Sequence, residues 1–121
     1  MTPSFLSELL DAWGKAVEAR DLESLMDLWT DDAVFAGASE EEVKVGPQIR
    51  EWFGAVLATD HTVEMSWQEP ILRLDGHLAW FMVHAAVTVD GTKPRPYRIS
   101  GVLRCDEGVW RFALWNGAEP H

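Results

Sequence analysis

The sequence predicts an α+β fold in which helices come first and a strongly bent antiparallel sheet follows. Apolar residues recur every three or four positions in the first sixty residues, as in amphipathic helices, and every second position from His61 onward, as in strands. Pro70, Pro96 and Gly101 interrupt strands of ten or more residues, which favours a strong bend. With 121 residues and 47% hydrophobic content, we expect one domain over residues 1–121.

The beginning of the chain predicts two consecutive helices joined by a tight turn. Thr2-Pro3 is typical of a helix start, and the three-to-four spacing of apolar residues then continues to about Arg20. Asp21 is a good N-cap for a second, shorter helix. One side of that helix is expected to carry Leu22, Leu25, Met26 and Trp29.

A short strand and a third helix follow. Residues 31–37, DDAVFAG, turn from acidic to apolar and predict a strand, whereas residues 38–46, ASEEEVKVG, are highly charged and indicate a solvated loop. Gly46-Pro47 places proline at the first position of a new helix. Its buried face is expected to consist of Ile49, Trp52, Phe53, Val56 and Leu57.

The second half of the chain predicts a four-strand meander. Residues 61–74 and 77–89 alternate in polarity on either side of Asp75-Gly76, a strong hairpin signal. Asp90-Gly91 and the turn at residues 106–108 separate two further strands, at 97–105 and 109–117. Three N-terminal helices would therefore close one side of the bent sheet and give a cone.

Composition excludes several classes of function. Ten Lys and Arg residues oppose twenty Asp and Glu residues, and the formal net charge of -10 disfavours nucleic acids and anionic membranes as partners. Cys105 is the single cysteine and no Cys/His cluster has zinc spacing, so we expect neither a disulfide nor a metal or other cofactor. The N-terminus lacks the pattern of a signal peptide, which predicts a cytoplasmic protein.

The chain resembles the SnoaL-like branch of the nuclear transport factor 2-like (ketosteroid isomerase-like) superfamily over nearly its whole length. The resemblance rests on EARDLESLMDLW, DDAVF, VGPQIREWF, GHLAW and SGVLRCDEGVWRFALWNGAEP, in this order and spacing. It implies a cone-shaped half-barrel with a pocket between the helices and the concave sheet, often dimerising through the outer face of the sheet. Members of the superfamily include steroid isomerases, dehydratases, epoxide hydrolases, polyketide cyclases and binding domains, so the resemblance alone selects no reaction.

Most functional residues of these relatives have no counterpart here. The resemblance places Trp13 where steroid isomerases have an oxyanion-stabilising tyrosine, and glycines, at about Gly37 and Gly101, where they have acids. Leu114 and Asn116 stand where many SnoaL-like proteins carry a His-x-His pair. The Asp-Arg-Asp constellation of the epoxide hydrolases has no convincing match either. Steroid-isomerase chemistry is therefore not expected.

Aromatic side chains are the main candidates for binding a ligand. Seven tryptophans exceed what a small core usually needs, and rigid rings suit a flat apolar ligand, although the same rings could simply fill the cone. The candidate substrate-binding residues are Trp13, Phe35, Trp52, Phe53, Tyr97, Trp115 and Asn116. The other four tryptophans, Trp29, Trp67, Trp80 and Trp110, are assigned to the core or to a dimer interface.

Two titratable residues are the catalytic candidates. His84 lies amid an apolar strand and could act as a general acid or base, or be a satisfied core or interface group; one bulge would turn it to the other face. Asp32, next to Asp31, could be a carboxylate with a raised pKa at the pocket mouth, or could end the second helix in solvent.

Two functions of different class remain open. The first is an isomerase, cyclase or hydrolase of unknown substrate, in which His84 or Asp32 moves a proton while Tyr97, Asn116 or Trp13 bonds a substrate oxygen. The second is a non-catalytic domain that binds a small apolar or aromatic metabolite. In either case we expect a homodimer, because helices on one side leave apolar area of the sheet uncovered.

Overall fold

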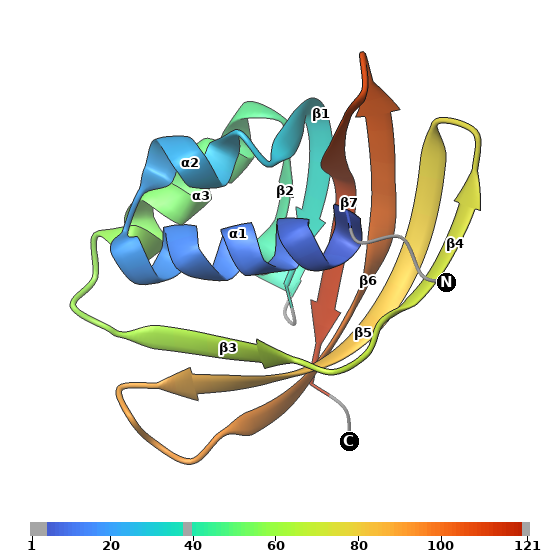
Figure 1. The fold of residues 1–121 in the computed structure, drawn as a ribbon. Helices are drawn as coiled ribbons and strands as arrows, with labels where there is room; N and C mark the ends of the chain where they lie inside the picture. The colour runs from blue at the N-terminus through green and yellow to red at the C-terminus, as the bar shows by residue number, and fades with distance from the viewer. Residues whose placement is uncertain (1–4, 38–39, 120–121) are drawn as a thin grey trace.

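A strongly curled sheet embraces three helices in the computed structural model, which describes residues 5–37 and 40–119 (Figure 1). The helices are α1 (Phe5–Ala19), α2 (Leu22–Met26) and α3 (Pro47–Leu57), with a 3-10 turn at Glu40–Glu42. The predicted start at Thr2-Pro3 lies outside the described residues. The helices cover the concave side of the sheet, so the predicted α+β class is confirmed. None of the described helices has the length and apolar character needed to span a membrane.

Seven strands make up the sheet within the described ranges. They are β1 (Trp29–Ala36), β2 (Val43–Val45), β3 (Val63–Trp67), β4 (Ile71–Asp75), β5 (Leu78–Val89), β6 (Arg95–Asp106) and β7 (Val109–Ala118). They follow the order β2-β1-β7-β6-β5-β3, and β4 also pairs with β5. All pairs are antiparallel except β1 with β7, which is parallel, so the sheet is mixed.

The predicted strand at residues 61–74 is two strands in the structure. β4 pairs with the first half of β5, and β3 pairs with its second half. Both short strands therefore lie along the same edge of the long strand β5. Pro70, in the connection, cannot donate a backbone hydrogen bond, which favours a break at this point. The last backbone bond before the break runs from the N–H of Gln68 to the carbonyl of His84, at 2.9 Å.

The prediction was wrong about the end of the second helix and about the charged loop. Helix α2 is a single turn, and Trp29 begins β1 instead of extending the helix. Asp31 and Asp32 consequently lie within β1 and do not end α2. The expected loop at residues 38–46 contains the 3-10 turn and β2, because Val43 and Val45 pair with the end of β1.

The inner face of the sheet carries the core. Strand register aligns Phe81, Gly101, Trp115 and Phe35 side by side across β5, β6, β7 and β1. Gly101 is required in this row because a Cβ there would overlap the carbonyl oxygen of Leu114 and crowd the ring of Phe81. Phe81 and Trp115 therefore flank a residue without a side chain, and both rings contact Phe112.

The outer face carries an apolar row of its own. Trp80, Val102, Leu114, Val34 and Val45 are direct neighbours across β5, β6, β7, β1 and β2. We call these five residues the outer row. Its two ends are widely exposed, with Trp80 at 49% and Val45 at 51%, so no part of the described chain covers them. In a monomer, this continuous apolar band is therefore at least partly exposed to solvent.

Two glycine-to-alanine substitutions should change stability in opposite directions. Gly101→Ala should lower the free energy of unfolding by about 1–3 kcal/mol, because the new methyl group is overpacked against backbone. Gly14→Ala should raise it by about 0.5–1 kcal/mol, since Gly14 is within α1 and a Cβ there meets no atom within 4 Å. Urea titrations of both variants beside the parent chain measure the effect, and an unchanged midpoint for Gly101→Ala would refute the close packing.

Candidate functional site

An aromatic cluster fills the space between the sheet and the helices. Trp115, which is 2% exposed, stacks on Trp13 of α1 with ring centroids 5.1 Å apart. Its ring centroid also lies 5.9 Å from that of Trp29 and 5.2 Å from that of Phe112. Trp29 in turn contacts Phe35 and Phe53, and all of these rings are buried. Four of the predicted ligand-binding residues, Trp13, Phe35, Phe53 and Trp115, are therefore brought together in one cluster.

Two polar atoms in this cluster have no hydrogen-bond partner. They are the indole Nε1 atoms of Trp13 and Trp29, both inaccessible to solvent. The side chains themselves are nearly completely buried, since Trp13 is 7% and Trp29 is 4% exposed. Buried N–H groups are nearly always paired in proteins, because leaving one unpaired costs about 1–3 kcal/mol.

The cluster reaches the surface at Trp67, between α1 and β3. Trp67 contacts the ring of Trp13 edge to face, with centroids 6.1 Å apart. A hollow of about 280 Å³ lies on its side toward Ser7 and Pro70, and another of about 340 Å³ lies on its side toward Gly14. Both hollows are lined by Trp67 and by Asp11 of α1. We call the two together the α1–β3 groove.

The rim of the α1–β3 groove is acidic. Its charged residues are Asp11, Glu18, Glu64, Glu69 and Lys15. Four carboxylates against one ammonium group, in a chain of net charge -10, create a negative potential at the opening. The groove therefore favours neutral or cationic molecules over anions.

Tyr97 lies at the far end of the inner face, against Gly117. A Cβ at Gly117 would overlap the tyrosine ring, so the glycine makes the space that Tyr97 occupies. The ring is half-buried and packs against the core. Burial raises the pKa of the phenol, and the nearby carboxylates of Glu42 and Glu119 raise it further. Tyr97 is thus a neutral hydroxyl donor over the physiological pH range.

The two remaining binding candidates lie apart from the cluster's centre. Trp52 is half-buried on α3, and the ammonium group of Lys44 stands 5.3 Å from its ring centroid. Asn116 is exposed, because it alternates with the inward-facing Trp115 and Gly117 on β7. Asn116 consequently points to the outer face and does not join the rings.

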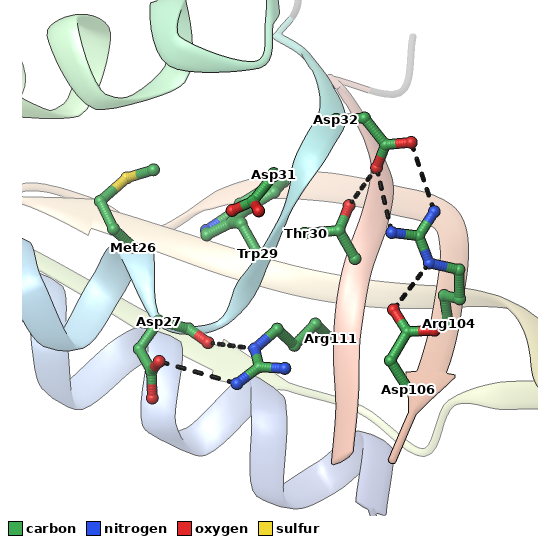
Figure 2. Close-up of a pocket in the computed structure, with 9 residues that line it drawn as sticks. All are labelled: Met26, Asp27, Trp29, Thr30, Asp31, Asp32, Arg104, Asp106 and Arg111. Atoms are coloured by element: carbon green, nitrogen blue, oxygen red, sulfur yellow. Dashed lines mark hydrogen bonds and ion pairs between the residues drawn. The ribbon is translucent and has the colours of Figure 1, made fainter. Parts of the chain in front are cut away.

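A further hollow, of about 430 Å³, is polar, and Trp29 of the cluster is among its lining residues (Figure 2). In it the guanidinium of Arg104 donates to both carboxylate oxygens of Asp32, at 3.2 and 3.3 Å, and to Asp106 at 3.0 Å. The hydroxyl of Thr30 donates to Asp32 at 3.0 Å. Hydrogen bonds from Arg104 and then Thr30 hold the pKa of Asp32 below its ordinary value.

This ion pairing makes Asp32 a poor proton carrier. A carboxylate that is exposed and has a lowered pKa stays ionised at neutral pH and is a weak base. The expectation of a raised pKa at Asp32 is therefore wrong. The bidentate pair with Arg104 was not predicted, because the two residues are distant in sequence and meet only across β7, which lies between β1 and β6 in the sheet.

His84 lies on the outer face of the sheet. It is exposed and sits opposite Arg98 across the β5–β6 pair, whereas its neighbours Val83 and Ala85 are buried on the inner face. The two catalytic candidates thus lie outside the aromatic cluster. Within the described ranges, the only buried polar residue is Thr30, and no three His, Cys, Asp or Glu residues group together so that they could hold a metal ion.

The chain belongs to the SnoaL-like family, because the family model of the SnoaL-like domain matches residues 6–117. This match confirms the resemblance identified from the sequence. No curated protein matches the chain.

Several solved structures share the fold. An NTF2-like protein of unknown function from Pseudomonas putida KT2440 is 16% identical with a TM-score of 0.85, covering 97% of this chain and 85% of its own. A protein from Streptomyces avermitilis, provisionally described as an NTF2-like dehydratase, is 15% identical with a TM-score of 0.82, covering 98% and 95%. A protein from Novosphingobium aromaticivorans, provisionally described as an aromatic ring hydroxylase, is 22% identical with a TM-score of 0.84, covering 100% and 93%. At these identities the likeness establishes the fold alone.

Titration of the single tyrosine tests its environment. Since folding raises the pKa of Tyr97, absorbance at 295 nm should show tyrosinate forming above pH 10, and Glu42→Gln should lower the midpoint. The sign follows from linkage: the neutral phenol's contribution to stability is complete below the unfolded pKa and is lost as pH rises through the folded one. Glu51→Gln on α3 is the control, and circular dichroism verifies folding at each pH. A midpoint at or below 10 in folded protein would contradict the assigned burial.

Proposed function

We propose that this SnoaL-like domain binds a flat, mainly apolar small molecule between α1 and the sheet, and that it does so without acid–base catalysis. The ligand enters through the α1–β3 groove at Trp67, and it reaches Trp13 and Trp115 by separating rings that are packed together in the unliganded chain. The observation that carries the proposal is an interior lined with aromatic rings and without any buried ionisable side chain among the described residues.

The continuity of the rings supports this route. Trp67 contacts Trp13, which stacks on Trp115, so an aromatic surface extends from the groove into the core. Rigid rings lose little conformational freedom when they bind, and stacked or edge-on pairs contribute about 0.5–1.5 kcal/mol beyond the area they bury. Flat ligands gain most from such a surface.

The placement of the titratable groups favours binding over proton transfer. A general acid or base must come within hydrogen-bond reach of the reacting atom. Asp32 is engaged by Arg104, and His84 is exposed on the opposite face of the sheet. Neither group is in contact with the rings that would hold the ligand.

Removing the ring at the groove should weaken binding. We expect the parent chain to bind a neutral flat probe, naphthalene, and Trp67→Ala to bind it about 5- to 30-fold more weakly, because one stacking surface is lost. Trp80→Ala is the matched control, since it removes a partly exposed tryptophan from the outer face. Competition with a fluorescent neutral dye measures both affinities. Equal affinity of the two variants would exclude the groove as the binding site.

An enzyme remains the second candidate, and Tyr97 is the residue that favours it. Its hydroxyl is half-buried on the inner side of β6, with carboxylates of Glu42 and Glu119 near enough to affect its pKa. A neutral phenol in this position could polarise a substrate carbonyl. Mass spectrometry of any bound compound after long incubation tests this candidate: turnover that disappears in Tyr97→Phe would support an enzyme.

We also propose that two copies associate through the outer face of the sheet. The outer row supplies apolar area across five strands, and Ile71 with Leu78 extends it at the β4–β5 end. Between Trp80 and Ala86 the outward residues of β5 and their partners on β6 and β7 include Arg98 but no carboxylate. In a chain of net charge -10, this is a surface on which two copies repel each other little.

Sedimentation tests the association. At micromolar concentration the parent chain should sediment as a dimer, and Trp80→Glu should be monomeric, because a charge in the outer row would be buried against its own copy. Leu74→Glu is the control, since Leu74 is 52% exposed but shares its face with Ala79 on the inner side. A parent chain that is monomeric at this concentration would overturn the proposal.

A further inference from the structure

We infer that the α1–β3 groove binds a linear polyamine, a flexible chain that carries two or more ammonium groups. The inference concerns the opening of the groove at the surface and does not depend on an apolar ligand in the interior. It starts from three features that meet at one place: the free edge of β3, a partly exposed tryptophan and an excess of carboxylates.

The edge of β3 that faces away from β5 carries backbone groups without a strand partner. β3 ends the sheet order, and β5 is its only strand neighbour in the described chain. Thr62 and Gln68, on either side of β3, both bond through their backbone to the β5 side, and the register between them is unbroken. Because backbone direction alternates along an antiparallel strand, Val63, Met65 and Trp67 point theirs the other way. Their carbonyl oxygens are therefore acceptors along the open edge.

The hollow on the Gly14 side of the groove lies directly at this edge. Glu64 and Met65 are successive residues of β3, so their side chains point to opposite faces of the sheet. Both nevertheless line the same hollow, which places that hollow at the edge of the strand. Helix α1, which runs beside β3, forms the other wall (Figure 1). Gly14 keeps this wall open, because even a Cβ there would meet no atom within 4 Å.

The groove is elongated. On α1 its lining residues extend from Ser7 to Glu18, which is about 16 Å along the helix at about 1.5 Å per residue. Trp67 and Asp11 line both hollows and so lie at the middle of the groove, whereas Glu69 and Glu18 each line only one of the two. An extended chain fits this shape better than a compact ligand.

The charges of the groove complement several spaced cations. Its carboxylates belong to Asp11, Glu18, Glu64 and Glu69, and no ion pair within the described ranges engages them. No three acidic, histidine or cysteine side chains of the described chain group closely enough to hold a metal ion. Ammonium groups can donate to these separate carboxylates and to the edge carbonyls, while the methylene segments between them pack on the ring of Trp67. A linear polyamine combines both properties.

Calorimetric titration with spermidine tests the inference. We expect the parent chain to bind spermidine more tightly than Mg²⁺ or hexylamine, and Asp11→Asn to weaken spermidine binding about 5- to 20-fold, because Asp11 lines both hollows. Glu51→Gln on α3 is the matched control, since it removes the same charge outside the groove and should leave the affinity nearly unchanged. Lys15→Gln should tighten binding about 2- to 5-fold, because it removes the one cation that lines the groove.

The indole resonance of Trp67 locates the bound chain. In a ¹H–¹⁵N spectrum of the parent chain, spermidine should shift the signal of Trp67 and leave that of Trp80 on the outer face in place. Trp67→Leu assigns the signal and should weaken binding about 2- to 5-fold through loss of the ring. Equal weakening by Asp11→Asn and Glu51→Gln, or Mg²⁺ binding as tight as that of spermidine, would mean diffuse charge attraction only and overturn the inference.

The inference and the proposed function fail separately. Spermidine binding without naphthalene binding would contradict the proposed function and leave the polyamine site standing. Naphthalene binding without spermidine binding would have the opposite consequence.

Discussion

The position of Trp115 against Trp13 is the contact on which the rest of the structure depends. It joins the last strand to the first helix. Gly101, the cross-strand neighbour of Trp115, has no side chain, and a Cβ there would overlap the backbone of Leu114 and crowd the ring of Phe81. The sheet curls around α1, and β3 lies beneath the helix (Figure 1).

Local sequence predicted the elements better than it predicted their neighbours. The helix beginning at Pro47, the Asp75-Gly76 turn and the alternation of β6 and β7 depend on short-range periodicity and turn residues, and these were confirmed. The parallel pairing of β1 with β7 depends on segments distant in the chain, so no local pattern indicates it. Trp29 fits the spacing of the preceding helix, yet it pairs with Phe112, because tertiary packing outweighs a weak helical preference.

The candidate site, too, could be predicted from the sequence only in part. Aromatic content indicated a ring-lined interior, and four of the six predicted rings meet there. Strand alternation could not place His84, since one irregularity reverses the face, and only the observed register shows it pointing outward. Trp67, which the sequence assigns to the core or an interface, is partly buried against the core and also lines the α1–β3 groove. Among the described residues the charged groups lie outside the buried core, so the rings of the interior have no fully buried ionisable side chain beside them.

The parallel pairing of β1 with β7, toward one edge of the sheet, also affects the order in which the protein can fold. β1 lies between β2 and β7, so residues 29–36 acquire their second partner only when residues 109–118 are available. Closing so long a loop before any compensating contact forms is slow, and it leaves β1 with an unpaired edge in the meantime. The C-terminal strand is thus the last part of the sheet to be supplied during synthesis, and its arrival protects the hydrophobic N-terminal strand from pairing with other chains.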